Sequence, residues 1–477
     1  MTLSEPRQTA TSVPVPEQRE RDRSTLILLT LCSAAFMAML DVFVVNVAFR
    51  SIGEAFARSS LSNLSWILNG YTIVFAALLI PAGRLADRYG RKAGFIVGLS
   101  VFAGASLACA LAPNLWWLIA FRVLQAAGAA ALLPTSLGLL LTALPVERRA
   151  GAVKIWATST SLAAAVGPVV GGALVKASWQ WVFLINVPIG VLALIGVVLL
   201  LPETKGPVQS KIPDILGAAV LALALGALSL ALVKGQEWGW SGTATVVSFV
   251  VAAIAFATVV VRVLRHPAPI IDPTLLKVRS FFWANVTTIL FCTAFGAVLP
   301  SVIFRLETGA HYDTLITGLA VAPGPLMVPF FAAVSQRVGR YLSVAWVVAI
   351  GNVLVGLGAV VMAVSAREQV HYATQLLPGW LIVGIGVGFT LPNLLAKATV
   401  DLPPAQVSTG SAIVNTSRQL GYVFGVVMLV AILGTLTAAT NSDALDSFRW
   451  GWWAIAAVGL LSTFTAFGIA PARSADK

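Results

Sequence analysis

The chain has 477 residues, of which 58% are hydrophobic and only 10% are charged. Because a soluble domain carries roughly a quarter of its residues as Asp, Glu, Lys or Arg, this composition excludes a soluble protein and indicates a membrane protein. The net charge of +12 could suggest a nucleic-acid partner. The basic residues gather in loops between apolar runs, however, so we expect no nucleic-acid binding.

Fourteen apolar runs are long enough to cross a bilayer, which takes about 20 helical residues. They centre near residues 38, 73, 102, 130, 164, 191, 223, 253, 292, 325, 352, 387, 420 and 460. Segments on the same side of the membrane as the amino terminus hold roughly three times as many Lys and Arg residues as segments on the opposite side. Such an excess marks the cytoplasmic face. We therefore predict an all-α, multi-pass protein of the cytoplasmic membrane, with both termini in the cytoplasm.

Asp41 is an acid inside the first run, and Arg122 is a base inside the fourth. A charge in the hydrocarbon core is costly, so by default it marks a path for ions, protons or substrate. At 1.5 Å per residue the two charges lie roughly 12 Å and 11 Å from the outer ends of their spans. If the first and fourth spans are neighbours, we predict that the two residues pair and take part in proton coupling. The alternatives are a static structural pair and an arginine that reaches the outer surface.

A short basic loop, Gly83-Arg-Leu-Ala-Asp-Arg-Tyr-Gly-Arg-Lys92, follows the second run. Asp87 in this loop can pair with an arginine or a helix end and hold the cytoplasmic side shut. The candidate residues of this cytoplasmic gate are Gly83, Asp87, Arg88, Gly90, Arg91 and, in a second copy of the loop, Arg337. The alternative is that these cations only obey the positive-inside rule.

The fifth run contains Ala163-Ala-Ala-Val-Gly-Pro-Val-Val-Gly-Gly172. Pro168 removes one helical hydrogen bond and kinks the helix. The three glycines, Gly167, Gly171 and Gly172, allow the backbone of a partner span to come close.

Two patterns of the first half recur in the second half. Ala332-Ala-Val-Ser-Gln-Arg-Val-Gly-Arg340 matches the loop at 83–92, and Gly386-Val-Gly-Phe-Thr-Leu-Pro392 resembles Gly128-Ala-Ala-Ala-Leu-Leu-Pro134. Nearly equal offsets predict two parallel six-span repeats with two spans between them, a transporter plan with its site at the repeat interface. The predicted division is 1–24 disordered cytoplasmic tail, 25–202 N-terminal six-helix bundle, 203–279 two inserted helices, 280–470 C-terminal six-helix bundle and 471–477 cytoplasmic tail.

Ser411, Asn415, Arg418 and Tyr422 fall on one stripe of a helix in the thirteenth run. A polar stripe does not face lipid favourably, so it faces the bundle interior, either to bind substrate or to pack against another helix. Further candidates for the substrate cavity are Asn46, Trp66, Tyr71, Gln125, Asn186 and Asn393, with ordinary packing as the alternative for each.

The ninth run is followed by Arg305, Glu307, His311 and Asp313, which we expect to form a solvated rim at the outer surface. Glu307 is a second candidate for proton uptake. Cys32, Cys109 and Cys292 all lie in apolar runs, so we expect no disulfide framework and no metal site. There is no phosphate-binding loop, no cofactor is expected, and ATP is not the expected energy source.

Three of these motifs resemble signatures of the major facilitator superfamily. Residues 83–92 resemble its loop signature G-x-L-a-D-R-x-G-R-K. Residues 118–128 resemble its l-x-x-x-R-v-x-Q-G element, with Ala126 where Gly is usual. Residues 163–172 resemble the antiporter signature g-x-x-x-G-P-x-x-G-G, with Ala163 in place of the first Gly. The resemblance implies the major facilitator fold, and the third motif favours export over import.

Two further segments resemble the fourteen-span drug:proton antiporter family. They are Leu40-Asp-Val-Phe-Val-Val-Asn-Val-Ala48 and Trp179-Gln-Trp-Val-Phe-Leu-Ile-Asn-Val-Pro-Ile-Gly190. The resemblance covers residues 25–470 and implies that the first and fourth spans line a central cavity. It also implies two six-helix bundles with two inserted central helices.

The predicted function is proton-coupled efflux of small amphiphilic compounds, such as drugs, antiseptics or an antibiotic natural product, by alternating access. Neutral or weakly acidic compounds are favoured slightly over dications, because Arg418 has no acid to balance it. The alternatives are a proton symporter that imports a small polar nutrient and a membrane protein that senses or catalyses without transport. The expected partners are the small-molecule substrate, protons and lipid, and we expect the protein to act as a monomer and not as an enzyme.

Overall fold

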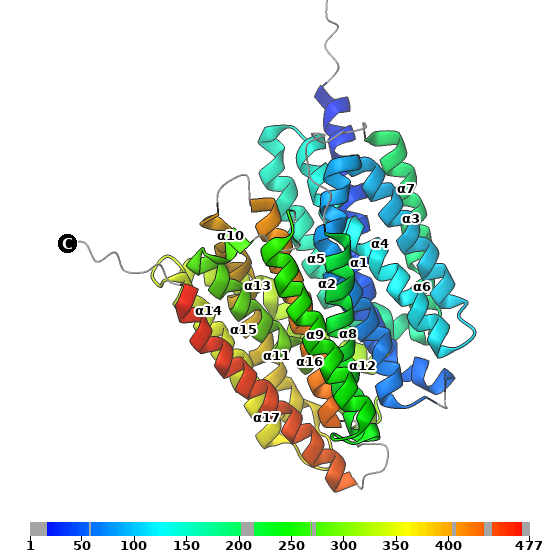
Figure 1. Ribbon diagram of the computed structural model, residues 1–477, viewed down its shortest axis with the longest axis vertical. Helices are drawn as coiled ribbons and strands as arrows, with labels where there is room; N and C mark the ends of the chain where they lie inside the picture. The colour runs from blue at the N-terminus through cyan, green and yellow to red at the C-terminus, as the bar shows by residue number, and fades with distance from the viewer. Residues whose placement is uncertain are drawn as a thin grey trace, which may run out of the picture.

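The computed structural model describes residues 17–56, 59–201, 214–267, 269, 273–402, 407–433 and 441–469. Within these ranges every regular element is a helix (Figure 1). Fourteen helical spans are long and apolar enough to cross a membrane. Each of the fourteen runs predicted from the sequence coincides with one of them, so the all-α membrane fold is confirmed.

The helices fall into a first half, a pair that follows it, and a second half. The first half holds α1 (Glu17–Ala55), α2 (Leu61–Tyr89), α3 (Arg91–Ala110), α4 (Leu115–Ala143), α5 (Val146–Val175), α6 (Trp181–Leu184) and α7 (Asn186–Leu200). The pair is α8 (Ile215–Trp238) and α9 (Thr243–Arg265). The second half holds α10 (Pro273–Leu276), α11 (Arg279–Gly309), α12 (Thr314–Val321), α13 (Pro323–Val338), α14 (Val344–Ser365), η1 (Tyr372–Leu376), α15 (Leu377–Val400), α16 (Val407–Leu433), α17 (Asn441–Ala466) and η4 (Phe467–Ile469).

Short polar side chains begin several of these helices. Asn114 accepts hydrogen bonds from the backbone N–H groups of Trp116 and Trp117 at the start of α4, both at 3.1 Å. Asp214 accepts one from Gly217 at 2.7 Å at the start of α8. Such caps satisfy N–H groups that have no partner inside the helix, and so they fix where apolar helices begin.

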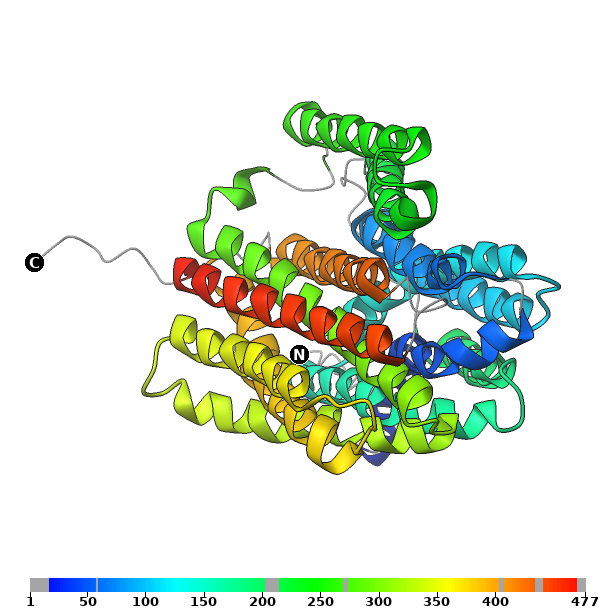
Figure 2. The ribbon, with the colours of Figure 1, turned by 90° about the horizontal axis from the view of Figure 1, so that it is seen from below.

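The two halves lie side by side, with α8 and α9 outside them (Figure 2). The α8 helix packs against α2 of the first half and α16 of the second, while α2–α16 and α5–α12 contacts join the halves directly. We call the end of the molecule where α1 and α11 finish the distal end, and the opposite end the proximal end. The exact boundaries of the predicted structural units stay a prediction.

The internal repeat is visible in the packing of two helix pairs. A Cβ atom on Gly128 of α4 would lie 2.6 Å from the backbone nitrogen of Phe102 on α3. In the second half, a Cβ on Gly386 of α15 would lie 2.5 Å from the carbonyl oxygen of Gly351 on α14. In both halves a glycine of the repeated segment therefore allows neighbouring helices to touch through their backbones.

The outer surface carries large apolar side chains that a soluble protein would bury. Leu192, Leu199 and Phe464 are 70%, 74% and 73% exposed, respectively. Contiguous apolar surface of this kind is favourable only against lipid. Asp41 and Arg122, in contrast, lie buried inside the bundle, and these are residues from which a site can be built.

Candidate functional site

The buried acid of α1 is held by three side chains from two other helices. Asp41 Oδ2 accepts a hydrogen bond from Arg122 Nη1 at 2.5 Å. Asp41 Oδ1 accepts from Gln125 Nε2 at 2.9 Å and from Asn186 Nδ2 at 3.0 Å. Arg122 and Gln125 lie about one turn apart on α4, and Asn186 begins α7. The ion pair predicted from the sequence is therefore present, and it ties three helices together.

This network is sealed from solvent. Asp41 and Arg122 are each 1% exposed, and Gln125 and Asn186 are fully buried. Gln125 Nε2 and Asn186 Nδ2 also donate to Ser106 Oγ on α3, at 2.8 and 2.9 Å. Two charges that are buried away from water are stable only when they pair with each other and are hydrogen-bonded. Every side chain of this cluster takes part in that pairing or hydrogen bonding.

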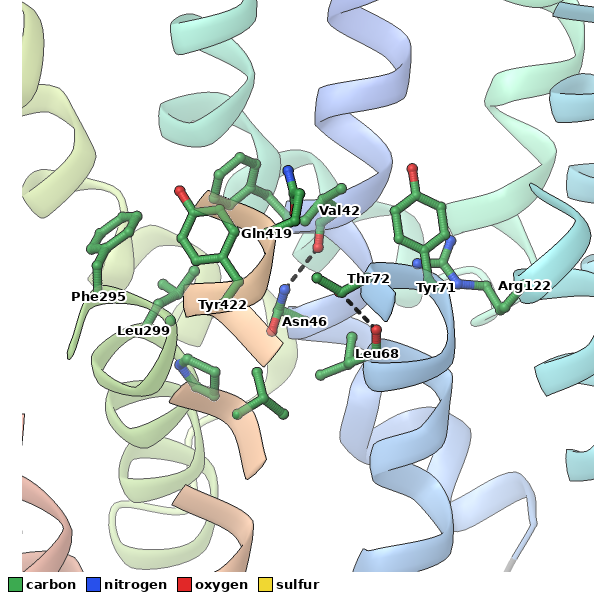
Figure 3. A pocket seen from close by; sticks show the side chains of 14 residues that line it. Val42, Asn46, Leu68, Tyr71, Thr72, Arg122, Phe295, Leu299, Gln419 and Tyr422 are labelled. Carbon is green, nitrogen blue, oxygen red and sulfur yellow. Dashed lines mark hydrogen bonds between the residues drawn. The ribbon is translucent and has the colours of Figure 1, made fainter. Parts of the chain in front are cut away.

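A cavity lies between the two halves, beside the Asp41–Arg122 pair (Figure 3). Its volume is about 60 Å³. Side chains from α1, α2, α4, α11 and α16 line it: Val42, Phe43, Asn46, Leu68, Tyr71, Thr72, Arg122, Phe295, Gly296, Leu299, Pro300, Gln419, Tyr422 and Val426. Pockets that hold drug-sized ligands measure roughly 300–1,000 Å³, so the cavity is too small for such a ligand in this conformation. A larger compound needs the halves to separate.

Arg122 reaches the cavity against the ring of Tyr71. The guanidinium carbon lies 4.1 Å from the ring centroid, a favourable cation–π distance. Figure 3 shows this stack at one edge of the cavity. Asp41 itself is not among the residues that line the cavity.

A second arginine lies in the other half. Arg418 Nη1 donates to Asn415 Oδ1 at 3.1 Å, and Asn415 Nδ2 donates to the carbonyl oxygen of Ser411 at 2.9 Å. Tyr422 lies one turn beyond Arg418 on the same helix. Arg418 Nε is buried without a hydrogen-bond partner. The polar stripe predicted on this helix is therefore a connected group, and its Tyr422 end lines the cavity.

Of the predicted cavity residues, Asn46, Tyr71 and Tyr422 line the cavity. Trp66 instead packs in an apolar cluster with α8. Asn393 Nδ2 donates to Ser335 Oγ at 2.9 Å and so joins α15 to α13. Gln125 and Asn186 belong to the network around the acid, where they serve the ion pair and not the cavity surface.

The sequence analysis did not select Phe295 or Gln419, which both line the cavity. Gln419 follows Arg418 and carried a weak signal, because it is polar inside an apolar run. Phe295 carried none, since an aromatic residue in a membrane helix faces lipid as readily as a cavity.

The predicted gate loop joins α2 and α3 at the proximal end. Asp87 Oδ1 accepts from Arg91 Nε at 2.7 Å, and Arg91 Nη1 donates to the carbonyl of Gly138 on α4 at 3.2 Å. Gly90 between the helices has φ 116°, a conformation that only glycine adopts readily. These contacts order the loop within the first half.

The other predicted gate residues are Gly83, Arg88 and Arg337. Gly83 faces the ring of Pro134 on α4, where an added Cβ would lie 3.5 Å away. The Arg88 guanidinium carbon lies 5.6 Å from the ring centroid of Tyr89. Arg337 is exposed in the last turn of α13. The second copy of the loop therefore lacks the ion pair of the first.

The Gly-Pro motif of α5 lies where α5 meets α1. A Cβ on Gly167 would lie 2.6 Å from the Cβ of Phe43, and one on Gly171 would lie 3.0 Å from the carbonyl oxygen of Val44. The two helices therefore touch within a few residues of Asp41.

The same motif also touches the second half. A Cβ on Gly172 would lie 2.5 Å from the carbonyl oxygen of Thr314 and 2.7 Å from the Cα of Leu315, at the start of α12. Gly318 of α12 in turn packs against the carbonyl of Pro168. The motif is therefore part of the interface between the halves towards the distal end.

Arg50 of α1 closes the distal end against α11. Its Nη1 donates to the backbone carbonyl of Glu307 at 2.8 Å, and its Nε pairs with Glu54 at 2.9 Å. Next to this contact the rings of Phe49 and Phe304 lie 5.3 Å apart. A polar and an aromatic contact thus join the two halves at this end.

The predicted solvated rim is wrong for two of its four residues. Arg305 and Glu307 are 4% and 1% exposed, because α11 continues to Gly309 and packs both side chains inward. Arg305 donates to the carbonyl of Arg367 at 2.5 Å. Glu307 Oε1 is buried without a hydrogen-bond partner. His311 and Asp313 are exposed as expected.

Comparison with known proteins matches residues 31–426 to the model of the Major Facilitator Superfamily. The chain belongs to the major facilitator superfamily. The resemblance derived from the motifs is thereby confirmed.

Among the relatives of this chain is the methylenomycin A resistance protein of Streptomyces coelicolor, 31% identical over 92% of each chain. Another is a probable actinorhodin transporter of the same organism, 33% identical over 85% of this chain and 71% of that protein. The tetracenomycin C resistance and export protein of Streptomyces glaucescens is 27% identical over 91% and 80%.

Solved structures share the fold of this superfamily member at low sequence identity. The peptide transporter POT matches with a TM-score of 0.67 and 18% identity over 93% of this chain and 94% of that chain. A bacterial homologue of the lysosomal transporter Spinster, inward-facing and unoccupied, matches with a TM-score of 0.65 and 16% identity over 95% and 99%. These matches confirm the major facilitator fold.

Proposed function

We propose that this protein is a proton-driven exporter of small amphiphilic compounds, such as drugs, antiseptics or an antibiotic natural product. Relatives named for methylenomycin A resistance and for tetracenomycin C resistance and export support this function. The observation that carries the proposal is the buried Asp41–Arg122 pair at the edge of a cavity between two halves. An ion pair at such depth is costly to keep, and in a membrane helix it marks a functional path.

Proton coupling follows from the competition between a proton and Arg122 for the same carboxylate. Protonation removes the charge of Asp41, so that Arg122 loses its ionic partner and the Tyr71 stack at the cavity edge can rearrange. Loss of the proton restores the pair. The membrane potential contributes about 2.3 kcal/mol per charge per 100 mV, which drives protons inward while substrate leaves.

Alternating access needs two bodies that move against each other, for which we propose residues 25–202 and 280–470. The insert 203–279 would then support α2 and α16 from outside. The Gly-Pro motif of α5 and the Arg50 contact join the bodies at the distal end, so both must break when that end opens. The gate loop with Asp87 and Arg91 would close the proximal end in turn.

Glu307 is proposed as a second proton site. Its Oε1 has no partner, and Arg50 donates to the backbone carbonyl and not to the carboxyl group. A buried carboxylate without a partner is unfavourable, so the neutral acid suits the closed distal end. Opening would expose the group to water and allow it to exchange a proton.

The membrane topology completes the proposal. The positive-inside bias places the proximal end and both termini in the cytoplasm of a bacterial cell, and the distal end outside. The cavity lies within one chain, so a monomer suffices for transport. Protons and the small-molecule substrate are the partners, besides lipid, and no enzymatic step is needed.

Transport in an efflux-deficient bacterial host tests the proposal. We expect the protein to lower the accumulation of some compounds of a broad panel, and a proton uncoupler to abolish that effect. Raised accumulation would instead favour the proton symporter. Accumulation that responds to neither the protein nor the uncoupler across the panel would favour a non-transporting sensor and refute the exporter.

A further inference from the structure

The wall of the central cavity is aromatic on both sides. Phe43 and Tyr71 come from the first half, and Phe295 and Tyr422 from the second. The rings of Phe295 and Tyr422 lie 6.1 Å apart at 54°, and Figure 3 shows Tyr71 and this pair at opposite sides of the cavity. Opposed aromatic side chains offer faces and edges to a flat ring system and favour it over a saturated skeleton of equal size.

Among the described residues that line the cavity there is no carboxylate, although Asp41 lies close to it. Both oxygens of Asp41 are already bound, Oδ2 by Arg122 and Oδ1 by Gln125 and Asn186. Arg122 is the charged member of the lining. A cationic compound would therefore meet a guanidinium first and find no free acid to pair with.

Arg418 adds a second cation, and nothing balances it. It lies one turn before the lining residue Tyr422 on the same face of α16. Its Nε has no hydrogen-bond partner, and within the described part of the chain no carboxylate forms a salt bridge with it. Each half therefore holds an arginine beside a cavity tyrosine, but among the described residues only Arg122 has a carboxylate partner.

We propose that the substrate is a planar aromatic compound with an acidic group, a carboxylate or an ionised phenol. The ring system lies between the Phe43–Tyr71 and Phe295–Tyr422 walls, and the acidic group points towards Arg418. This inference rests on the proposed export function and names its substrate class. The membrane potential supports this substrate class, because a negative cell interior drives anions out while it draws protons in.

Two sets of matched probes separate ring type from charge. The first set is anthracene-2-carboxylate, its carboxamide and the protonated 2-(aminomethyl)anthracene, and the second is adamantane with the same three groups. The measurement is the uncoupler-sensitive initial rate of uptake into inside-out membrane vesicles that contain the full chain. We expect the anthracene carboxylate to be carried fastest, the amide more slowly and the amine least, with each adamantane compound below its aromatic counterpart.

Variants then place the two parts of the substrate. Arg418→Gln keeps hydrogen-bonding capacity and removes the charge, so it should slow the anthracene carboxylate about tenfold and leave the amide unchanged. Arg418→Lys, which keeps the charge, should retain most of the carboxylate rate. Phe295→Leu should lower the preference for anthracene over adamantane by about threefold, whatever the charge of the probe.

The outcomes distinguish this inference from the function on which it rests. If no probe and no compound of the broad panel is exported, the export function fails and the inference falls with it. If panel compounds are exported but the amine is preferred, or the anthracene set is not favoured over the adamantane set, export stands and the substrate class is overturned. Equal slowing of acid and amide by Arg418→Gln would overturn the role of Arg418. If that variant fails to fold, the rank order in the wild-type protein still decides.

Discussion

The carboxylate of Asp41 accepts hydrogen bonds from three side chains. Glu307 Oε1, in contrast, has no hydrogen-bond partner, although both residues are buried to the same degree. The first carboxyl group can keep its charge because Arg122 compensates it, and removing one partner of such a pair costs about 3–5 kcal/mol. The second lies at the interface of the halves, where its surroundings change when the distal end opens. Their different environments suit two different steps of proton transfer.

Asp41→Asn should reduce proton-driven export to the level of cells without the protein. The amide can still hydrogen-bond with Gln125 and Asn186, but it cannot release a proton or balance Arg122. Since the unpaired arginine destabilises the fold, export is compared with Asp41→Asn/Arg122→Gln, which removes both charges. We expect the double variant to express well and remain inactive. Export by either variant that collapses with an uncoupler as in the wild type would contradict the coupling role.

Glu307→Gln should make export less dependent on external pH. The amide fills the same space at a site where Oε1 has no partner, so folding should persist, but it cannot exchange a proton. The measurement is the initial export rate of one substrate between external pH 5.5 and 8. Glu54→Gln, on the exposed side of Arg50, is the matched control. A pH profile identical to that of the wild type would remove Glu307 from the mechanism.

At the scale of elements, α5 is placed by its small residues. Gly171 meets the backbone of α1, and Gly172 meets the backbone of α12 from the other half. Backbone atoms cannot move aside as a flexible side chain can, so any side chain at these positions pushes whole helices apart. The motif therefore controls how closely the halves approach at the distal end.

Gly172→Ala should slow export about tenfold, since an overpacked contact costs roughly 1–3 kcal/mol. Its Cβ would lie 2.5 Å from the carbonyl oxygen of Thr314, which prevents full closure. Gly104→Ala on α3 is the matched control, because no heavy atom lies within 4 Å of its added Cβ. The measurement is the export rate per molecule at equal expression. Equal rates for the two variants would show that the close approach is not needed.

The inserted pair has its own anchor in Asp214. Burial alone would raise the pKa of this carboxyl group, but hydrogen bonds from Arg262 and from the Gly217 N–H lower it overall below its ordinary value of 3.8. A lowered pKa in the folded state means that Asp214 stabilises the protein above about pH 4. That stabilisation is lost as the pH falls through the folded-state value.

Asp214→Asn keeps the cap, since Asn is as good an N-cap residue as Asp, but it loses the ion pair with Arg262. It should therefore lower the melting temperature at neutral pH, at a cost of up to about 1 kcal/mol. Below pH 4 the wild type should lose this advantage, so the two melting curves converge. The measurement is the melting temperature in detergent between pH 3 and 7. Asp446→Asn, whose carboxylate is 64% exposed, is the control. A constant gap between wild type and Asp214→Asn at all pH values would be the contrary result.

For the whole molecule, the cavity of about 60 Å³ is too small for an antibiotic, so transport requires the halves to move. The distal contacts of Arg50 and of the Phe49–Phe304 ring pair hold this end closed. Transport is then a cycle in which these contacts form and break once per substrate.

Phe49→Cys/Phe304→Cys, joined by a short thiol crosslinker, should lock the distal end and stop export. The rings lie 5.3 Å apart, so the thiols come within reach, and the native Cys32, Cys109 and Cys292 are buried. Cleavage of a reducible crosslinker should restore the rate, and each single variant treated in the same way is the control. Undiminished export by the crosslinked protein would exclude movement at this contact.

Several features of the site could be predicted from the sequence, and others could not. The equal depth of Asp41 and Arg122 followed from the fixed rise of a helix per residue, and the family resemblance placed their two spans together, so that the pair could be predicted. The burial of Arg305 and Glu307 was not predicted, since the sequence does not show whether a polar helix end packs against other parts of the protein. Phe295 was missed because helix rotation decides between lipid and cavity.

The sequence by itself determined the fourteen spans, the repeat and the two buried charges, Asp41 and Arg122. These follow from the length of apolar runs and from the cost of a charge in hydrocarbon, which are properties of each segment. Only the tertiary structure decided that Phe43 and Tyr71 face Phe295 and Tyr422 across one cavity. That arrangement depends on how helices distant in the chain rotate and cross, and no single segment encodes it.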